Sequence, residues 1–408
     1  MTEQTNTPKL RFPEFKDEWK LQKLGNLAQF SKGKSLSKKD LNINGKPCIL
    51  YGELYTKYGA ILNKVYSKTS TQNDSLVFSK RNQILIPSSG ETDIDIATAT
   101  AIDTDVKIAV GGDLNIITPI NSDGRFISLY INGKGKYNLA KYAQGKSVVH
   151  LYNSDIKKLN FYLPTNMAEQ KKVGDFFSKL DCQIELEEKK LELLEQQKRG
   201  YMQKIFSREL RFKDDNGNDY PDWEMKKLGN IANIVGGGTP STKKSEYWDG
   251  NINWFSPVEI GDKEFVSTSQ RRITEKGLEK SSAKMLPIGT VLFTSRAGIG
   301  KTAILSKEAT TNQGFQSIVP KENDLDSYFL YSMTSILKRD AEKVGAGSTF
   351  SEVSRKQMEQ IKLLIPILKE QKQIGRLFQI INRKINKQLH KIELLKQRKK
   401  GLLQKMFI

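Results

Sequence analysis

The chain has 408 residues, a formal net charge of +20 at pH 7 and a pI near 9.6. Hydrophobic residues make up 37% of it, which supports packed cores and excludes wholesale disorder. Two cysteines exclude a disulfide framework. No apolar run approaches the roughly 18 residues of a membrane span and the polar N-terminus is no secretory signal, so we expect a cytoplasmic chain. The positive charge favours a polyanionic partner, most commonly nucleic acid, with generic solubility charge as the alternative.

The segment at residues 10–28 recurs near the middle of the chain. It reads LRFPEFKDEWKLQKLGNLA, and residues 210–232 read LRFKDDNGNDYPDWEMKKLGNIA. Trp19 corresponds to Trp223 in this alignment. The segment therefore opens the chain and also follows its first long helix. We expect its first copy to pack beside the end of the second long helix, near Phe407, as in a repeat that closes on itself.

Two variable blocks, at residues 26–163 and 230–365, lie between the repeated elements. Both contain short β-like runs punctuated by Gly, Asn and Ser. The run that begins at Ile84 resembles the run that begins at Val291, and each is an apolar strand before a polar loop. We predict that each block is a compact α+β domain with a mainly antiparallel sheet.

Two long helices are predicted at residues 169–206 and 370–407, each shortly after a proline. They align at a constant offset of 201 residues without a gap. In both, apolar residues recur at spacings of four and three, the heptad pattern of a helix that packs along another helix. The seam residues are Val173, Phe177, Leu180, Ile184, Leu191, Leu194, Tyr201 and Ile205 in the first helix, and Ile374, Phe378, Ile381, Ile385, Ile392, Leu395, Leu402 and Met406 in the second. Asn166 and Glu169 form a predicted capping box.

The two helices differ in charge but share polar seam positions. Residues 169–206 carry eight basic and eight acidic residues, whereas residues 370–407 carry eleven basic and two acidic residues. Glu187 corresponds to Gln388 and Lys198 to Lys399, and polar seam residues fix register at a cost in stability. The alternatives to two helices that pair within one chain are an ordinary core helix and a homodimeric coiled coil. Two matched copies in one chain favour pairing within the chain, which the connectivity requires to be antiparallel.

Two glycine-containing segments are candidates for contact with phosphates. Gly236–Ser241 reads GGGTPS, which is either a bare turn or a loop whose backbone N–H groups and hydroxyls approach a phosphate. Ser31–Ser35 reads SKGKS, occupies the equivalent place in the first block and is more basic. Further on, Trp254-Phe255-Ser256 parallels Leu50-Tyr51-Gly52, with the edge of a core strand as the alternative interpretation.

Residues 295–302 read SRAGIGKT and partly match a phosphate-binding P-loop. The match lacks the first glycine, where Ser295 stands, and the residues that follow have no helical period. The corresponding Pro87–Gly90 contains no Gly-Lys. We therefore interpret the segment as a polar loop whose Arg296 and Lys301 face phosphate or a base edge.

No motif supports catalysis or metal binding by this chain. The two histidines and two cysteines are far apart in sequence, and no adenine-methyltransferase sequence motif is present. The candidate contacts to DNA are Lys32, Lys34, Ser35, Tyr51, Ser88, Ser89, Lys146, Ser147, Gly237, Gly238, Thr239, Ser241, Trp254, Ser256, Ser295, Arg296, Lys301, Ser348 and Thr349.

The order of these elements resembles the specificity subunits of type I restriction-modification enzymes. The resemblance rests on two variable blocks, each followed by a repeated helix that opens with Pro164–Gln170 or Pro366–Gln371. It also rests on the Leu228-Gly229-Asn230-Ile231 run, which leads into GGTPS and then to Trp254 and Ser256. The first block departs from the pattern because it has SKGKS in place of GGTPS.

The resemblance implies an α+β architecture in which two small α/β target recognition domains are joined by two long antiparallel coiled-coil helices, with a pseudo-two-fold internal repeat. It implies recognition domains at residues 1–163 and 209–365 and spacer helices at residues 164–208 and 366–408. Each domain would read one half of a bipartite site in double-stranded DNA, and the helices would set the gap.

The resemblance also implies partners and their cofactors. The helices would dock two methyltransferase subunits, which restriction-translocase subunits join. S-adenosylmethionine, ATP and Mg²⁺ would bind to those partners and not to this chain. A stand-alone DNA-binding regulator and a coiled-coil adaptor for proteins are the alternative functions. A steep salt dependence of DNA affinity would exclude the adaptor.

Overall fold

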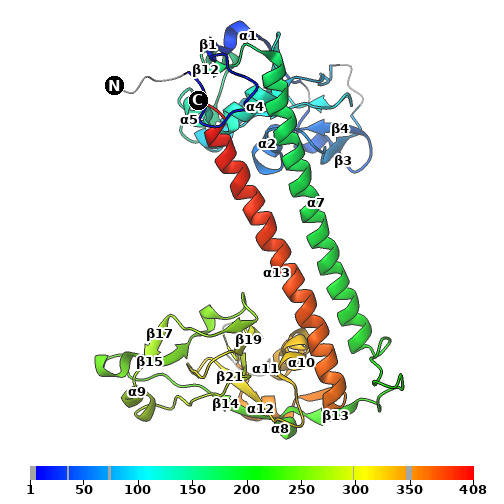
Figure 1. The fold of residues 1–408 in the computed structure, drawn as a ribbon, viewed down its shortest axis with the longest axis vertical. Coiled ribbons are helices and arrows are strands. Elements are labelled where there is room, and N and C mark those ends of the chain that lie inside the picture. The colour runs from blue at the N-terminus through cyan, green and yellow to red at the C-terminus, as the bar shows by residue number, and fades with distance from the viewer. Residues whose placement is uncertain (1–5, 35, 72–74, 297, 346–351) are drawn as a thin grey trace. The chain divides into compact units, whose positions relative to one another are not determined.

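The structure is a computed structural model that describes residues 6–34, 36–71, 75–296, 298–345 and 352–408. The chain divides into two units: unit 1 is Met1–Leu191 with Gln388–Ile408, and unit 2 is Glu192–Lys387. The long helices α7 (Met167–Phe206) and α13 (Leu368–Lys405) each contribute one segment to each unit, and within each unit the two segments run antiparallel (Figure 1).

Unit 1 holds the first variable block, built on small antiparallel sheets. The central sheet has the strand order β2-β10-β6-β8, and a second sheet has the order β3-β5-β4-β9 with one parallel pair, β4 with β9. Its elements are β1 (Lys20–Lys23), α1 (Leu24–Leu27), β2 (Ala28–Lys32), β3 (Leu41–Asn42), β4 (Lys46–Ile49), α2 (Tyr51–Thr56), β5 (Ser67–Thr69), β6 (Ile84–Pro87), β7 (Ser89–Gly90), α3 (Asp93–Ile96), β8 (Thr100–Ala101), β9 (Ala109–Val110), β10 (Leu114–Pro119), α4 (Gly124–Asn132), α5 (Lys136–Ala140), β11 (Val149–His150), α6 (Asn153–Ile156) and β12 (Asn160–Leu163).

Unit 2 repeats this plan with a five-stranded central sheet and a three-stranded second sheet. The central sheet has the order β14-β21-β18-β19-β16, and the second has the order β17-β15-β20. Its elements are β13 (Glu224–Lys227), α8 (Leu228–Ile231), β14 (Ala232–Gly236), β15 (Trp248–Phe255), β16 (Phe265–Val266), β17 (Arg271–Ile273), α9 (Glu275–Glu279), β18 (Val291–Phe293), β19 (Thr302–Leu305), β20 (Thr310–Thr311), β21 (Gln316–Pro320), α10 (Ser327–Ser332), α11 (Thr334–Gly345), α12 (Arg355–Gln360) and β22 (Lys362–Ile365), with short 3-10 turns η2 (Ser245–Tyr247) and η3 (Pro257–Glu259).

Equivalent strand pairs relate the two blocks and correct one alignment made from sequence. Ile84 pairs with Ile117 and Val291 pairs with Ile318, which confirms the match between these two apolar strands. Ile49 pairs in parallel with Val110, as Phe255 does with Thr311. Phe255 therefore corresponds to Ile49, and the predicted match of Trp254-Phe255-Ser256 with Leu50-Tyr51-Gly52 is wrong by two residues. The error arose because these short strands share no side-chain pattern.

The heptad seam predicted from sequence is buried or half-buried along both helices. Phe177 is buried in the core of unit 1, and Phe378 is buried in the core of unit 2, where it stacks on Phe206. In unit 1 the polar seam residues find partners: the Gln388 amide donates to a Glu187 carboxylate oxygen at 2.7 Å, and Lys399 forms an ion pair with Asp181. These polar contacts lie within the helix pair, where the seam pattern predicts register-fixing residues.

The repeated Glu-Gln dipeptide at each helix start binds the neighbouring segments. Glu169, 1% exposed, accepts hydrogen bonds from the Arg11 guanidinium and the Trp19 indole N–H. The Gln170 side chain accepts from the backbone N–H of Asp123, which caps α4. The predicted capping box is therefore only half right. Asn166 does cap the helix by accepting from the N–H of Ala168, but Glu169 turns towards the N-terminal segment.

Unit 2 contains the same arrangement around its own Glu-Gln pair. Glu370 is fully buried and accepts from Arg211, at 3.2 and 2.8 Å. Gln371 accepts from the backbone N–H of Asp326, which caps α10. The hydrogen bonds to the glutamates raise the pKa of both arginines, Arg11 and Arg211. Each helix start is thereby fixed both to the segment that precedes its block and to a helix of that block.

The N-terminal segment packs beside the end of α13, as the repeat predicts. The Leu10 backbone N–H donates to the Lys405 carbonyl at 2.9 Å, and the Trp19 ring lies 6.4 Å from the Phe407 ring. In unit 2 the Leu210 N–H makes the same bond to the Lys204 carbonyl at the end of α7. The N-terminal segment thus packs on the end of α13 in the same way as its second copy, near residue 210, packs on the end of α7.

Candidate nucleic-acid interface

Four connections of unit 2 meet beside one end of its central sheet. They are the GGTPS segment after β14, the turn η3 after β15, the loop between β18 and β19, and the loop between β20 and β21. Backbone hydrogen bonds join them: Gly238 N–H to Thr311 O at 2.8 Å, Asn312 N–H to Phe255 O at 3.0 Å, and Ser295 N–H to Gly314 O at 2.8 Å. We call this set of connections the loop cluster of unit 2.

Unit 1 contains an equivalent loop cluster, built from the same four connections. Lys34 N–H donates to Val110 O at 3.2 Å, Gly111 N–H to Ile49 O at 3.0 Å, and Ser88 N–H to Asp113 O at 2.9 Å. Each of these bonds corresponds to one in unit 2. The backbone framework is therefore duplicated while its side chains differ.

The glycines of both clusters are required by close backbone approach. A Cβ atom on Gly33 would lie 2.0 Å from the Gly111 carbonyl oxygen, and one on Gly237 would lie 2.0 Å from the Asn312 carbonyl oxygen. No side chain fits at such distances. These two glycines therefore hold the first connection against the fourth, a structural role that the sequence alone did not separate from phosphate binding.

Several of the predicted contact residues have exposed side chains near the clusters. In unit 1 they are Lys32, Lys34, Tyr51, Lys146 and Ser147; in unit 2 they are Ser241 and Lys301, with Thr239 and Arg296 half-buried. The Thr239 hydroxyl hydrogen-bonds to the Gln313 amide oxygen. Arg296 lies beside Gly314, with its Nε 3.5 Å from where a Cβ atom on that glycine would stand. Thr239, Arg296 and Gln313 thus form a polar group at the cluster of unit 2.

Other predicted contacts are held within the fold. Ser88 is 4% exposed, and Ser89 opens the short strand β7, so part of the polar loop that the sequence predicted is buried or in a strand. Ser295 is fully buried, Gly238 is buried, and the Ser256 hydroxyl donates to Glu259 in a capping box. Ser35, Ser348 and Thr349 lie outside the described residues.

Trp254 is a buried residue that hydrogen-bonds to the backbone of the GGTPS segment. It is 5% exposed, and its indole N–H donates to the Gly238 carbonyl at 2.8 Å. The neighbouring Trp248 donates to the Ser241 carbonyl, and the Arg271 guanidinium lies 3.7 Å from the centre of the Trp248 ring. These two rings fix the backbone of the segment, while Arg271 keeps an exposed cation beside it.

The strand β19 rules out a nucleotide-binding P-loop. A P-loop lysine is followed by a helix whose N-terminus faces the phosphates. Here Lys301 is followed at once by β19, whose first residue is Thr302. The Thr294 hydroxyl donates to the Gly298 carbonyl and accepts from the Lys301 backbone N–H, which closes the loop on itself.

Sequence reasoning missed His150 and Tyr152 in unit 1 and Gln313 in unit 2. The Lys32 ammonium lies 5.8 Å from the centre of the Tyr152 ring, and the His150 ring stacks near Tyr152 at 6.1 Å. β11, which holds His150, pairs with β7 and so brings residues 144–153 beside Ser89. His150 ends β11 and Tyr152 directly precedes α6, so two rings two residues apart were the available signal; Gln313 carried none.

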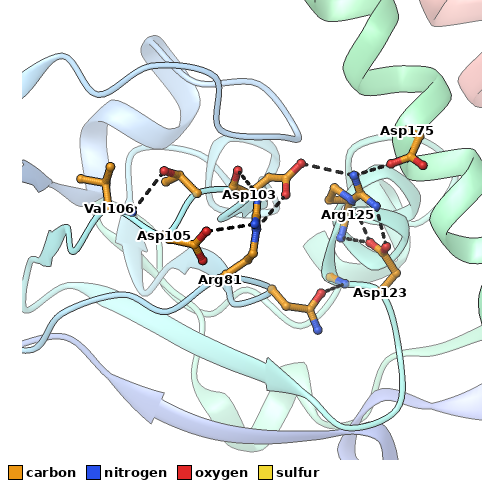
Figure 2. Close-up of polar contacts among 10 residues, drawn as sticks. Arg81, Asp103, Asp105, Val106, Asp123, Arg125 and Asp175 are labelled. Atoms are coloured by element: carbon orange, nitrogen blue, oxygen red, sulfur yellow. Dashed lines mark hydrogen bonds and ion pairs between the residues drawn. The ribbon is translucent and has the colours of Figure 1, made fainter.

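An ion-pair network ties the first block to helix α7 (Figure 2). The Arg125 guanidinium on α4 reaches Asp123, Asp103 and Asp175, at 2.9, 3.2 and 2.7 Å. Asp175 belongs to α7 and is 57% exposed, whereas Arg125 is 16% exposed. These carboxylates raise the pKa of Arg125 against the opposing effect of burial. The network thus links the first variable block to the helix.

The described residues contain no cluster of His, Cys, Asp and Glu able to hold a metal ion. None of the helices in the described part of the chain combines the length and apolar character that a membrane crossing requires.

The family model for the type I restriction modification DNA specificity domain matches residues 16–196 and again residues 220–396. Two matched domains, each with a variable block and a long helix, cover most of the sequence. The chain belongs to this family, and it is a type I restriction-modification specificity subunit.

Known relatives agree with this assignment. The MjaIX specificity subunit of Methanocaldococcus jannaschii is 35% identical over 50% of this chain and 48% of its own length. The EcoR124I/EcoR124II specificity subunit of Escherichia coli is 35% identical over 37% of this chain and 39% of its own length. The chain thus spans about half or less of these first relatives. The MjaVIII specificity subunit of M. jannaschii is 22% identical over 97% of this chain and 92% of its own length.

Solved structures show the same fold. The crystal structure of a type I restriction-modification S subunit from M. genitalium matches with a TM-score of 0.66 at 17% identity, over 98% of this chain and 99% of that one. A structure described as showing complex assembly and conformational transition of a type I system matches with a TM-score of 0.53 at 16% identity, over 94% and 96%. At these identities the likeness establishes the fold alone.

Proposed function

We propose that each recognition block of this chain reads one half of a bipartite DNA target. The observation that supports this most strongly is the loop cluster that each unit builds on equivalent hydrogen bonds but fills with different side chains. Such an arrangement presents different donors and acceptors from the same framework. Two unlike blocks in one chain would then read two unlike half-sites.

The exposed side chains of the clusters suit base and phosphate contacts. Arg and Lys pair with guanine and Gln with adenine in the major groove, and lysines and hydroxyls bind phosphates. Unit 2 offers Arg296, Gln313 and Thr239, and unit 1 offers Lys32 and Lys34. The net charge of +20 favours the approach of a polyanion.

The helices are proposed to set the distance between the half-sites and to dock two methyltransferase subunits. In this proposal the recognition domains are residues 1–163 and 209–365, and the spacer helices are residues 164–208 and 366–408. Adenine methylation with S-adenosylmethionine, and translocation and cleavage with ATP and Mg²⁺, take place on the methyltransferase and restriction subunits. This chain then acts without catalysis, by selecting the DNA sequence.

Mapping methylated adenines in cells with and without this gene tests the proposal. With the methyltransferase gene intact, loss of this gene should abolish methylation of one bipartite motif and leave other motifs unchanged. An unchanged methylation map would contradict the proposal. The salt dependence of DNA binding adds a second measurement, since an adaptor for proteins would lack the steep fall in affinity with salt that phosphate contacts cause.

A further inference from the structure

The segment of α13 in unit 2 carries an unbalanced positive charge. Residues 371–387 contain five basic residues and no acidic residue, whereas the equivalent residues 170–186 of α7 contain three of each. Arg376, Arg383, Lys384 and Lys387 all lie in unit 2 and are exposed. We call these four residues the cationic face of α13.

The cationic face has no internal partner in the part of the chain that the structure describes. No ion pair or side-chain hydrogen bond forms at any of the four side chains, although acidic residues elsewhere on these helices are paired. The acidic residues near this segment, Glu195, Asp262 and Glu264, line a cleft of about 400 Å³ with Asn382 and Asn386. Neighbouring residues of a helix are about 100° apart around its axis, so Asn386 and Lys387 point in different directions.

Comparison with the equivalent positions in unit 1 shows that this charge is specific to one copy. Arg376 corresponds to Asp175, which the Arg125 guanidinium engages (Figure 2). In unit 2, Tyr328 takes the place of Arg125, since both lie two residues after the aspartate that caps the helix. Tyr328 donates instead to Glu264. Arg376 is therefore left as an exposed cation where unit 1 has a neutralised carboxylate.

We propose that the cationic face of α13 binds the phosphate backbone of duplex DNA, outside the bases that the loop clusters read. This inference rests on the proposed function, because it takes DNA as the ligand of the chain. Arg376 and Lys387 are eleven residues apart, or about 16.5 Å along the helix axis. Duplex DNA carries one negative charge per roughly 1.7 Å of its own axis, so a duplex beside this face offers a phosphate to every cation.

Such contacts add affinity without sequence preference and make binding steeply dependent on salt. They also make the two units unequal in their contacts with the DNA backbone, since α7 presents no such cationic face. The duplex is gripped more tightly on the side of unit 2. A solvated surface charge, or a face that docks an acidic protein, would give neither effect.

The test replaces Arg383, Lys384 and Lys387 with glutamine in the full-length chain. The matched control replaces Lys171, Lys179 and Lys190 of α7 with glutamine, which removes the same charge from exposed positions of the other helix. Affinity for a duplex that contains the methylated motif, and for one that lacks it, is measured from 50 to 200 mM NaCl. Each lost phosphate contact lowers the steepness of log Kobs against log salt by about 0.9.

The α13 variant should lose about 2 to 3 in that slope on both duplexes, while its preference between them stays unchanged and the control keeps the original slope. An unchanged slope, an equal loss in the control, or no DNA binding by the unmodified chain overturns the inference. Weaker binding of the methyltransferase subunit with an unchanged DNA slope also overturns it and identifies a protein-docking face. Steep salt dependence in the unmodified chain without preference for any sequence would instead refute the proposed function alone.

Discussion

Individual side chains in the loop clusters divide into those that face solvent and those that build the framework. The sequence placed its candidate contacts on these connections but did not distinguish the two kinds of side chain. Ser295 and Arg296 are adjacent, yet Ser295 is fully buried and Arg296 is half-exposed. Ser88 was predicted on a polar loop and is buried as well. Whether a loop side chain is buried depends on which neighbouring strand or loop covers it. That neighbour is set by strand pairings between residues far apart in sequence.

Arg296 is the side chain whose loss should affect recognition most directly. Arg296→Ala removes a guanidinium at the cluster of unit 2, and an arginine–guanine pair is worth about 1–3 kcal/mol of discrimination. Methylation should fall, or relax at one position, in the half-site read by the second block. Arg339→Ala on α11, an exposed arginine paired with Asp340, is the control. An unchanged methylation pattern in the Arg296 variant would assign this loop a purely connecting role.

Glu370 tests whether the Glu-Gln pair is a structural clamp. Glu370→Gln leaves Arg211 without its buried carboxylate, and loss of a charged hydrogen-bond partner in a buried site costs about 1–3 kcal/mol. Asp215→Asn breaks the exposed ion pair with Lys369, and an exposed pair contributes little to stability. Thermal unfolding should show a clearly larger loss for the Glu370 variant. Equal losses would mean that the clamp contributes no more than a surface pair.

The helices were the elements best predicted from sequence, because a heptad pattern is local and repeats. Their starts, their seam and their antiparallel pairing follow from the spacing of apolar residues and from the order of elements along the chain. The short strands carry little signal: β20 has two residues, and its pairing with β15 corrected the match of Trp254 by two positions. The partner of Glu169 was also missed, since Arg11 lies 158 residues away.

The proposed spacing role of the helices can be tested by lengthening both together. Four residues inserted after Leu191 and four after Lys387 keep the two seams matched and add about 6 Å and about 40° beyond a full turn. DNA advances about 3.4 Å per base pair, from about 34 Å per turn. The methylated motif should gain one or two base pairs in its spacer with both half-sites unchanged. The same insertion in α7 alone mismatches the seam and should lower stability.

An unchanged spacer at normal methylation levels in the double insertion would show that partner subunits, and not α7 and α13, set the distance between half-sites.

At the level of the whole molecule, the repeated elements form a closed arrangement, in which the N-terminal segment lies beside the end of α13. Leu10 contacts Lys405 as Leu210 contacts Lys204. The sequence predicted this closure because the segment at residues 10–28 recurs after the first helix. How the recognition blocks differ could not be predicted in the same way, since their loops have no common pattern.

A circular permutant tests the closure. Ile408 is joined to the N-terminus by a short flexible linker, and the chain is opened at Gly217, an exposed turn residue with φ of +83°. The new ends then mimic the natural ones, and such joins succeed where termini are close. The permutant should fold and bind DNA with the affinity of the natural chain. A permutant that is folded by circular dichroism but binds neither DNA nor the methyltransferase subunit would contradict the closed-repeat account.

The central claim is that each unit reads its own half of the target. Replacing residues 230–345 with the corresponding block of a relative of known target, and sequencing the methylome, tests it most directly. The account predicts that one half of the methylated motif changes to that of the relative while the other half stays as it was. A change in both halves, or in neither at normal methylation levels, would contradict it.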